Sequence, residues 1–392
     1  MPVAVTVALV IALWHPTDPE PPTTARSSTS TTPSPTLPPI PIPGHEVYGF
    51  VPYWEMDDGI VAHVGQTDLT TLAVFSVTHR KDGSLASTEN GYKRITGQVG
   101  RALIAVAHDR GIRVDLVYTS FGTAKNAAFY GDPDAQARTI AELTALVADL
   151  GVDGINVDVE QLDAEHIPAY GAFVGRLRAA LRERDEHALV SVATTANVSG
   201  SAMALAASLS GADRIFMMGY DYRVSGSEPG ASAPLGRRDG SQKTLAWSLD
   251  LYRDIGVPAD RTILGLPLYG MSWPVLGPEV GAAASGKGSV WVPRQNLDTL
   301  ADPSATPAYD ATEDVEVLVV PEGDAWRAIY YDTAASLRPK LALADDRGLA
   351  GAGFWAIGYE RGLADYTKLI ATFRAGEILS ETGSREPGAS TP

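Results

Sequence analysis

The feature that most constrains the fold is a repeat of short apolar runs, most of which are separated by a helical pattern. Eight of these runs are strand candidates, at 47–51, 72–77, 114–118, 155–159, 190–193, 215–218, 263–268 and 353–357. Repeated strand–helix units with eight strands predict an α/β fold of the (β/α)8 TIM barrel type. A doubly wound parallel sheet is the alternative, and the count of eight disfavours it.

Two helices between the strands have clear signals. The first is expected to begin after Asp132 as N-cap, with Pro133 at its first position, and to end at Gly151. The second runs to Arg184 with apolar residues on one face.

One interval breaks the repeat. Residues 270–326 separate the seventh strand from the last strand–helix unit and are too long for a simple connection. They include a strand-like run at 315–320 and several aromatic residues. We expect a small inserted subdomain between strand 7 and strand 8, and a disordered excursion around 281–288 is the alternative.

The two ends of the chain differ from its centre. Residues 1–14 are apolar and have the length of a secretory signal, although no Lys or Arg precedes them, so they predict a signal peptide or membrane anchor. A hydrophobic start without function is the alternative. Residues 15–44 read as a Pro/Thr/Ser-rich linker, 45–375 as the barrel, and 376–392 as a disordered tail. A secreted or cell-envelope location, with possible membrane or cell-wall tethering, is therefore expected.

Charge and cysteine content exclude several kinds of function. The chain has 47 acidic and 31 basic residues and a net charge of −16, which opposes binding to nucleic acid. It has no cysteine, which excludes disulfides, thiolate nucleophiles and cysteine-based zinc sites. A neutral or weakly charged partner fits better.

Polar residues interrupt the fourth strand candidate at alternate positions. Asn156, Asp158 and Glu160 share one face of a strand, while the residues between them are apolar. Burying unpaired carboxyl groups is unfavourable and raises their pKa values. This pattern therefore favours proton chemistry at a strand end.

Acids and aromatic residues also end the later strands. Met218, Tyr220 and Asp221 close the sixth strand, Tyr269 closes the seventh and Trp355 the eighth. In barrels of this type the active site lies at these strand ends. Each aromatic alone belongs more often to a core, but their shared position favours a groove that binds the apolar faces of sugars.

At these residues the chain resembles glycoside hydrolase family 18, the chitinase family. The strand-four signature Asp-x-x-Asp-x-Asp-x-Glu is represented by Asp153, Asn156, Asp158 and Glu160. Further family-like motifs are 218–221, 265–270, Trp355, and 330–332 with Ser336 and Lys340. The likeness covers about 47–374. The strand-four segment and 48–54, which includes Tyr53 and Trp54, are most similar to the bacterial branch of cell-wall and spore-cortex N-acetylglucosaminidases.

The resemblance implies retaining hydrolysis of β-1,4 bonds beside N-acetylglucosamine, assisted by the acetamido group of the substrate and without a cofactor or metal. It makes Glu160 the general acid and base, Asp158 the group that orients the acetamido nitrogen, and Tyr220 a hydrogen-bond donor to the acetamido oxygen. Substrate-binding roles would fall to Asn156, Met218, Asp221, Trp355, Tyr269, Tyr53 and Trp54. Glu160 is expected to hold its proton because of the apolar barrel mouth and the charge of Asp158.

Two positions depart from the family. Asn156 replaces an acid, so it is expected to donate a hydrogen bond to Asp158 and to alter the pH dependence. The strand-three Ser-x-Gly-Gly is Thr119-Ser120-Phe121-Gly122 here, which affects the neighbouring subsites.

Two alternatives to this function remain open. A catalytically inactive, chitinase-like glycan-binding protein is one, and a metal-dependent hydrolase that uses Asn156, Asp158 and Glu160 as oxygen ligands is another. The substrate is an oligosaccharide or polysaccharide containing N-acetylglucosamine, either chitin or peptidoglycan, and a monomer is expected.

Overall fold

The structure is a computed structural model that describes residues 44–302 and 307–377. The predicted signal segment 1–14, all but the end of the linker, and most of the tail therefore lie outside the described residues. Among the described helices, none has both the length and the apolar character needed to span a membrane.

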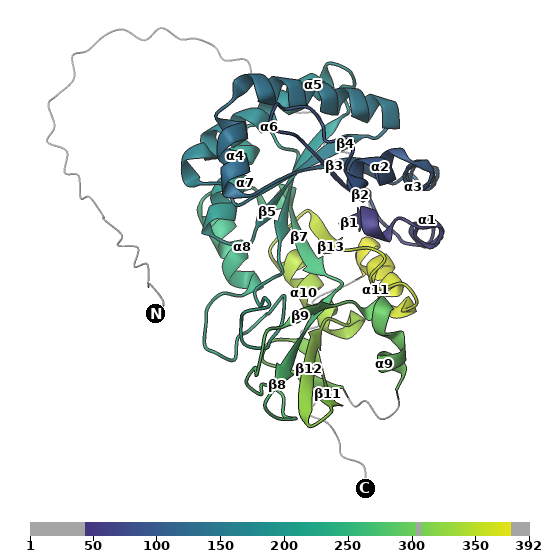
Figure 1. Cartoon of the computed structure of the whole chain (residues 1–392), viewed down its shortest axis with the longest axis vertical. Coiled ribbons are helices and arrows are strands. Elements are labelled where there is room, and N and C mark those ends of the chain that lie inside the picture. The colour runs from purple at the N-terminus through teal and green to yellow at the C-terminus, as the bar shows by residue number, and fades with distance from the viewer. Residues whose placement is uncertain (1–43, 303–306, 378–392) are drawn as a thin grey trace, which may run out of the picture. The chain divides into compact units, whose positions relative to one another are not determined.

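Eight parallel strands close into a barrel, as predicted (Figure 1). Each contains or overlaps one of the predicted runs, and β1 pairs with both β2 and β13 to close the ring. In chain order the strands are β1 (Glu46–Pro52), β2 (Thr71–Thr78), β3 (Arg113–Phe121), β4 (Gly154–Glu160), β5 (Leu189–Thr195), β6 (Arg214–Met218), β7 (Thr262–Pro267) and β13 (Gly351–Trp355).

Helices surround the barrel. They are α1 (Asp58–Val64), α2 (Asn90–Thr96), α3 (Gln98–Asp109), α4 (Thr123–Tyr130), α5 (Pro133–Leu150), α6 (Ile167–Arg182), α7 (Val198–Leu209), α8 (Leu245–Asp254), α10 (Ala334–Asp346) and α11 (Ala364–Arg374). The Asp132 side chain caps α5 by accepting from the backbone N–H groups of Asp134 and Ala135, and Gly151 ends the helix at φ 68°. Both boundaries of α5 are thus confirmed, whereas α6 ends two residues before Arg184.

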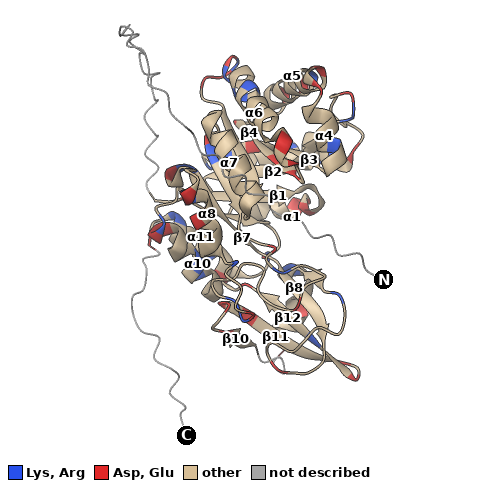
Figure 2. Ribbon diagram, turned by 90° about the vertical axis from the view of Figure 1, so that its left-hand side faces the viewer, with Lys and Arg blue, Asp and Glu red and all other residues tan. Residues whose placement is uncertain are grey.

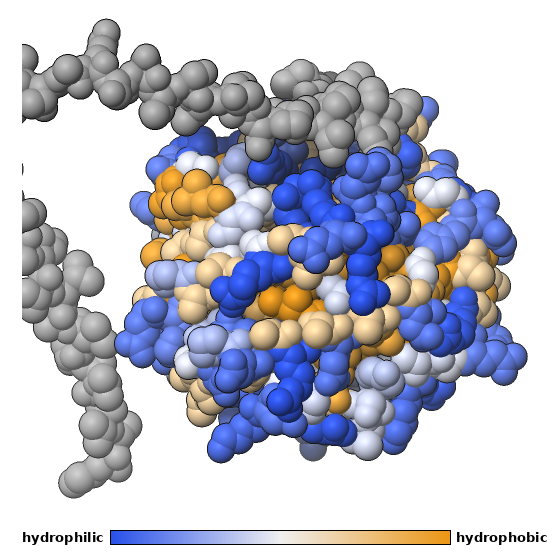
Figure 3. All heavy atoms as spheres, turned by 90° about the horizontal axis from the view of Figure 1, so that it is seen from above, coloured by the Kyte–Doolittle hydropathy of each residue, from blue (hydrophilic) through white to orange (hydrophobic). Residues whose placement is uncertain are grey.

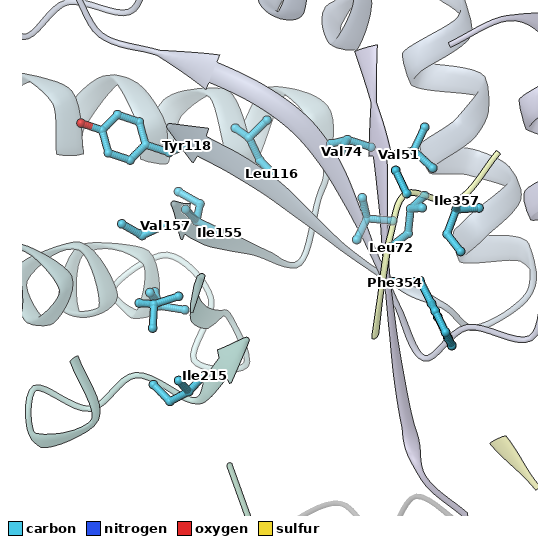
Figure 4. Close-up of a cluster of buried hydrophobic side chains, with 14 of the residues drawn as sticks. Val51, Leu72, Val74, Leu116, Tyr118, Ile155, Val157, Ile215, Phe354 and Ile357 are labelled. Atoms are coloured by element: carbon cyan, nitrogen blue, oxygen red, sulfur yellow. The ribbon is translucent and has the colours of Figure 1, made fainter. Parts of the chain in front are cut away.

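Strand alternation creates two separate apolar layers. Outward-facing side chains such as Val74, Leu116 and Val157 are fully buried against the helices (Figure 4). Inward-facing side chains such as Phe50, Val117 and Phe216 fill the barrel itself. On the outside, the face seen in Figure 3 is mostly hydrophilic with small apolar groups. The barrel is therefore a packed scaffold that leaves its strand ends free for a site.

The predicted insertion is present and carries its own sheet (Figure 1). Five strands pair in the order β10-β11-β12-β8-β9 around a separate apolar cluster that includes Trp273 and Val317. The elements are β8 (Gly270–Val275), β9 (Ser289–Trp291), α9 (Leu297–Ala301), β10 (Ala308–Asp310), β11 (Val315–Glu322) and β12 (Ala325–Tyr331).

The predicted boundaries of the insertion need one correction. The sheet continues to Tyr331 rather than ending at residue 326, because β12 pairs along its whole length with β11. Residues 281–288, for which disorder was the alternative, form a loop hydrogen-bonded to β8: the backbone N–H of Ser285 donates to the carbonyl of Pro274 over 2.9 Å.

Candidate active site

A cleft of about 1300 Å³ opens at the carboxyl ends of the barrel strands. Nine of the ten residues expected in the site line it, and Asn156 is the exception. The nine are Tyr53, Trp54, Asp158, Glu160, Met218, Tyr220, Asp221, Tyr269 and Trp355. The topology therefore brings together residues that are up to about 300 positions apart in the chain.

Glu160 stands at the end of β4 with its side chain half-buried in the cleft. Its carbonyl oxygen accepts a hydrogen bond of 2.6 Å from the Asn126 side-chain amide, which itself accepts from the Ser120 hydroxyl over 2.6 Å. The next residue, Gln161, has φ 60°, so the chain turns sharply away from the strand. Within the described residues the Glu160 carboxyl group has no hydrogen bond or ion pair, so it is free to meet a substrate.

The surroundings of Glu160 favour its protonated form. Burial raises the pKa of Glu160, and the negative charge of Asp221 raises it further. The expectation that Asp158 supplies this charge is wrong. Asp158 is more deeply buried, and burial together with the Glu160 charge raises the pKa of Asp158 well above its usual range. Asp158 therefore holds its own proton more tightly and is the poorer source of negative charge.

Asn156 lies below the cleft inside the barrel and is fully buried. Its amide nitrogen donates to the Ser191 hydroxyl over 2.9 Å. Ser191 in turn donates to Asp115 over 3.0 Å, and the Tyr48 hydroxyl donates to the same Asp115 oxygen over 2.7 Å. The expected hydrogen bond from Asn156 to Asp158 is therefore absent among the described residues: the amide nitrogen is directed to Ser191, and the Asn156 carbonyl oxygen and one Asp158 carboxyl oxygen have no partner there.

A tyrosine pair and a carboxyl group form another part of the cleft wall, at the ends of β6 and β7. Tyr269 donates a short hydrogen bond to Asp221, and the rings of Tyr220 and Tyr269 meet edge to face with centroids 6.1 Å apart. Asp221 has φ 62°, and its backbone N–H donates to the Ser232 hydroxyl over 3.0 Å. The cleft walls desolvate the Asp221 carboxyl and raise its pKa, although the residue lies at the open surface. The Tyr220 hydroxyl has no hydrogen bond within the described residues, so it can donate to a ligand.

Aromatic side chains form the floor and one rim of the cleft. Trp355 contacts Phe75 edge to face at a centroid distance of 4.8 Å and Phe50 at 5.6 Å. Trp54 follows at 6.2 Å from Trp355, is held by a 3.0 Å hydrogen bond from its indole N–H to Tyr359, and remains 48% exposed. The aromatic rings around Trp355 are packed against it, and the Trp54 indole remains partly open, so this surface suits the stacking of a sugar ring.

Several lining residues were not predicted. Phe121, which departs from the family's strand-three motif, is 43% exposed on the cleft wall. Arg237, Lys243 and Trp247 come from the segment that follows β6, where no strand end marked them. Phe121 is the last residue of β3, three positions beyond the end of the strand predicted at 114–118, so the strand-end rule that identified Trp355 missed it. The other three lie on a loop and a helix whose course the sequence pattern does not fix.

No group of His, Cys, Asp or Glu side chains in residues 44–302 and 307–377 is arranged to hold a metal ion.

Comparisons with known proteins agree on one family. The family model described as Glycosyl hydrolases family 18 matches residues 46–360. The chain is 27% identical over 232 residues to Chitinase 63 of Streptomyces plicatus, which covers 52% of this chain and 35% of that protein. It spans between about a third and a half of the length of its first curated relatives.

Solved structures show the same fold. A class V chitinase from Nicotiana tobaccum superposes with a TM-score of 0.70 at 18% identity, covering 85% of this chain and 99% of that one. The spore cortex-lytic enzyme SleL of Bacillus cereus superposes with a TM-score of 0.66 at 17% identity, covering 84% and 74%. The chain therefore shares its fold with a plant chitinase and with a bacterial spore cortex-lytic enzyme.

Proposed function

The chain belongs to glycosyl hydrolases family 18, and on that premise we propose that it hydrolyses β-1,4 bonds of glycans that contain N-acetylglucosamine, with retention of configuration and with Glu160 as general acid and base. The single observation that carries the proposal is the state of Glu160. It is half-buried at a strand end in the cleft, unpaired among the described residues, and its pKa is raised by burial and by the Asp221 charge. A carboxyl group kept protonated towards neutral pH can act as an acid.

In the first step the Glu160 proton passes to the glycosidic oxygen as the bond to the anomeric carbon breaks. The acetamido oxygen of the same sugar attacks that carbon, and a cyclic oxazolinium ion forms. Asp158, two residues below Glu160 on the same strand face, is placed to accept from the acetamido nitrogen. Tyr220, whose hydroxyl is unpaired among the described residues, is placed to donate to the acetamido oxygen.

In the second step water adds to the anomeric carbon, gives a proton to Glu160, and the bond to the acetamido oxygen breaks. Two inversions at one carbon give net retention. Trp355 supplies the apolar floor under the reacting sugar, while Trp54 and Tyr53 extend the aromatic surface along the cleft. We further propose that the substrate is chitin or peptidoglycan and that the chain is exported.

The second candidate is a catalytically inactive protein that binds glycans, and the presence of Glu160 argues against it.

The experiment is to compare the wild type with Glu160→Gln on chitooligosaccharides and on purified sacculi, measuring new reducing ends and identifying them by mass spectrometry. We expect Glu160→Gln to lower kcat by about 100-fold or more while leaving ligand affinity within a few fold, because the amide keeps the shape of the side chain but cannot transfer a proton.

The matched control is Glu165→Gln, a neighbouring glutamate that is exposed and lies outside the cleft. It should retain wild-type turnover. Near wild-type turnover of Glu160→Gln would assign the proton to another group, and glycan binding by the wild type without release of reducing ends would favour the inactive relative.

A further inference from the structure

A second cavity of about 650 Å³ lies beside the cleft, at the end of β2 and the start of α4. Three basic side chains line it, Arg80, Lys81 and Lys125, against a single acid, Glu89. Basic positions are visible on α4 and on nearby loops in Figure 2. A locally positive cavity is notable on a chain whose net charge is −16.

The cations in this cavity have no anionic partner. In the described part of the chain none of the three makes an ion pair within 4.0 Å: Lys125 donates to the Thr78 hydroxyl over 2.6 Å, and Arg80 to the Thr88 hydroxyl over 3.4 Å. Lys125 is half-buried, and burial lowers its pKa. A half-buried ammonium group bonded to a neutral hydroxyl is incompletely stabilised, so it favours an anion in the cavity.

The remaining titratable residue of the cavity, His79, adds no charge. His79 is buried and stacks on Phe129 with ring centroids 4.1 Å apart. Burial and the charge of Lys125 lower the pKa of His79 to about 3, so the imidazole is neutral near pH 7. The positive potential therefore comes from Arg80, Lys81 and Lys125, and it is only partly offset by Glu89.

The cavity and the cleft are lined by neighbouring residues of the same two segments. Ser76 and Phe121 line the cleft, whereas Thr78 and Ala124, a short distance further along the same two segments, line the cavity. The two regions are joined by hydrogen bonds through Thr119, which lies 3.3 Å from the Ser76 hydroxyl and accepts from Thr78 over 2.7 Å. Two residues of a strand span roughly 7 Å. A glycan in the cleft can therefore place a substituent in the cavity.

We infer that this cavity binds a carboxylate carried by the glycan, so that the enzyme prefers chains in which N-acetylglucosamine alternates with an acidic sugar over neutral chitin chains. The inference rests on the proposed function, because it names the substrate class of the same cleft. Lys125 supplies the half-buried contact, while Lys81 and Arg80 add attraction at the surface. The carboxylate can belong to a lactyl ether on the sugar itself or to a peptide attached to it.

The test compares three probes: chitotetraose, a tetrasaccharide alternating N-acetylglucosamine with N-acetylmuramic acid, and the same tetrasaccharide bearing stem peptides. The readout is the ratio of kcat/KM on each acidic probe to kcat/KM on chitotetraose. We expect Lys125→Gln to lower this ratio by about 10-fold, since it removes a charged hydrogen-bond donor. Lys81→Gln, at an exposed position that tolerates substitution, should lower it by roughly 2- to 3-fold.

Lys368→Gln is the matched control, because this lysine is exposed on α11 and lines neither cavity nor cleft. It should keep the wild-type ratio. An effect of Lys125→Gln with the peptide-free acidic probe assigns the sugar's own carboxylate, and an effect only with the peptide-bearing probe assigns the peptide. A ratio unchanged in both Lys125→Gln and Lys81→Gln overturns the inference.

Binding measured by calorimetry in the Glu160→Gln background separates failure of the proposed function from failure of the carboxylate-binding inference. If the wild type cleaves none of the probes, the proposed function fails. The ratio of Kd values for acidic and neutral probes, with and without Lys125→Gln, then still decides whether the cavity recognises a carboxylate.

Discussion

Three carboxyl groups at the barrel mouth differ in how strongly they hold a proton, because their surroundings differ. Asp158 is fully enclosed, Glu160 is half-buried, and Asp221 lies at the open edge with a hydrogen bond from Tyr269 that stabilises its charged form. Asp221 is therefore the most readily ionised of the three. Its negative charge raises the pKa of Glu160, which lines the same cleft.

Asp221→Asn tests this tuning. Removing the negative charge makes ionisation of Glu160 easier, so the pKa of Glu160 falls and the protonated acid is lost at a lower pH. The alkaline limb of the kcat/KM profile should move down by roughly half to one pH unit. The measurement is a pH series with a soluble chitooligosaccharide, with Asp163→Asn, at an exposed position outside the cleft, as control. A limb that stays in place, or moves up, would show that Asp221 does not raise the pKa of Glu160.

The residues of the site could be predicted where a strand end fixes them. Glu160, Asp158 and Trp355 follow from strand alternation and from the rule that barrel sites lie at the carboxyl ends of strands. The partner of Asn156 could not be predicted, because Ser191 and Asp115 lie on the two strands beside β4 and only the barrel register brings them together. Asn126 lies on α4 and donates a hydrogen bond to the Glu160 carbonyl. Only the folded barrel brings α4 beside the end of β4, so this contact has no signal in the sequence.

At the level of elements, a buried ion pair connects the inserted sheet to a helix of the barrel. Asp332 follows β12 and accepts hydrogen bonds from Lys340 and Ser336 of α10. Lys340 is 0% exposed. The sequence placed these residues in a family-like motif, and the structure gives the physical reason: a fully buried ammonium group needs a carboxylate partner.

Asp332→Ala should lower the free energy of unfolding by about 3–5 kcal/mol, because it leaves the Lys340 charge buried and unpaired. The double variant Asp332→Leu with Lys340→Met should recover much of this loss, since no charge then remains buried. Urea unfolding monitored by far-UV circular dichroism is the measurement.

Glu322→Ala is the control for that prediction, because Glu322 pairs with Arg327 on the exposed end of the same sheet and should contribute less than about 1 kcal/mol. Equal losses from Asp332→Ala and Glu322→Ala would contradict the account of the buried pair.

Element boundaries were predicted well for the barrel and less well for the insertion. The barrel strands are continuous apolar runs because helices cover them outside and side chains fill them inside, and such runs are easily found in a sequence. The inserted sheet is antiparallel, and its strands β9 and β10 are only three residues long. Their pairing depends on β8 and β12, so the sequence pattern alone could not set the end of the sheet.

At the level of the whole molecule, the buried acid Asp158 links stability to pH. Its pKa is raised in the folded protein, so above its usual pKa the folded state retains a proton that the unfolded state releases. Stability therefore falls as pH rises from about 4 towards the folded pKa, by about 1.4 kcal/mol for each unit by which that pKa is raised.

Asp158→Asn has no such ionisation, so its stability relative to the wild type should increase with pH. Thermal unfolding of both proteins from pH 4 to pH 9 measures this difference, and contributions from other buried acids common to both largely cancel. Parallel stability curves over this range would contradict a protonated Asp158 in the fold.

The central claim is that Glu160 acts together with the acetamido group of the substrate. It is tested most directly by kcat/KM for a series of aryl N-acetylglucosaminides or chitooligosaccharides whose acetyl group carries zero, one, two or three fluorine atoms. Each fluorine withdraws electrons and makes the acetamido oxygen a poorer nucleophile. The account predicts a progressive fall in kcat/KM along the series, and equal kcat/KM for all four substrates would contradict it.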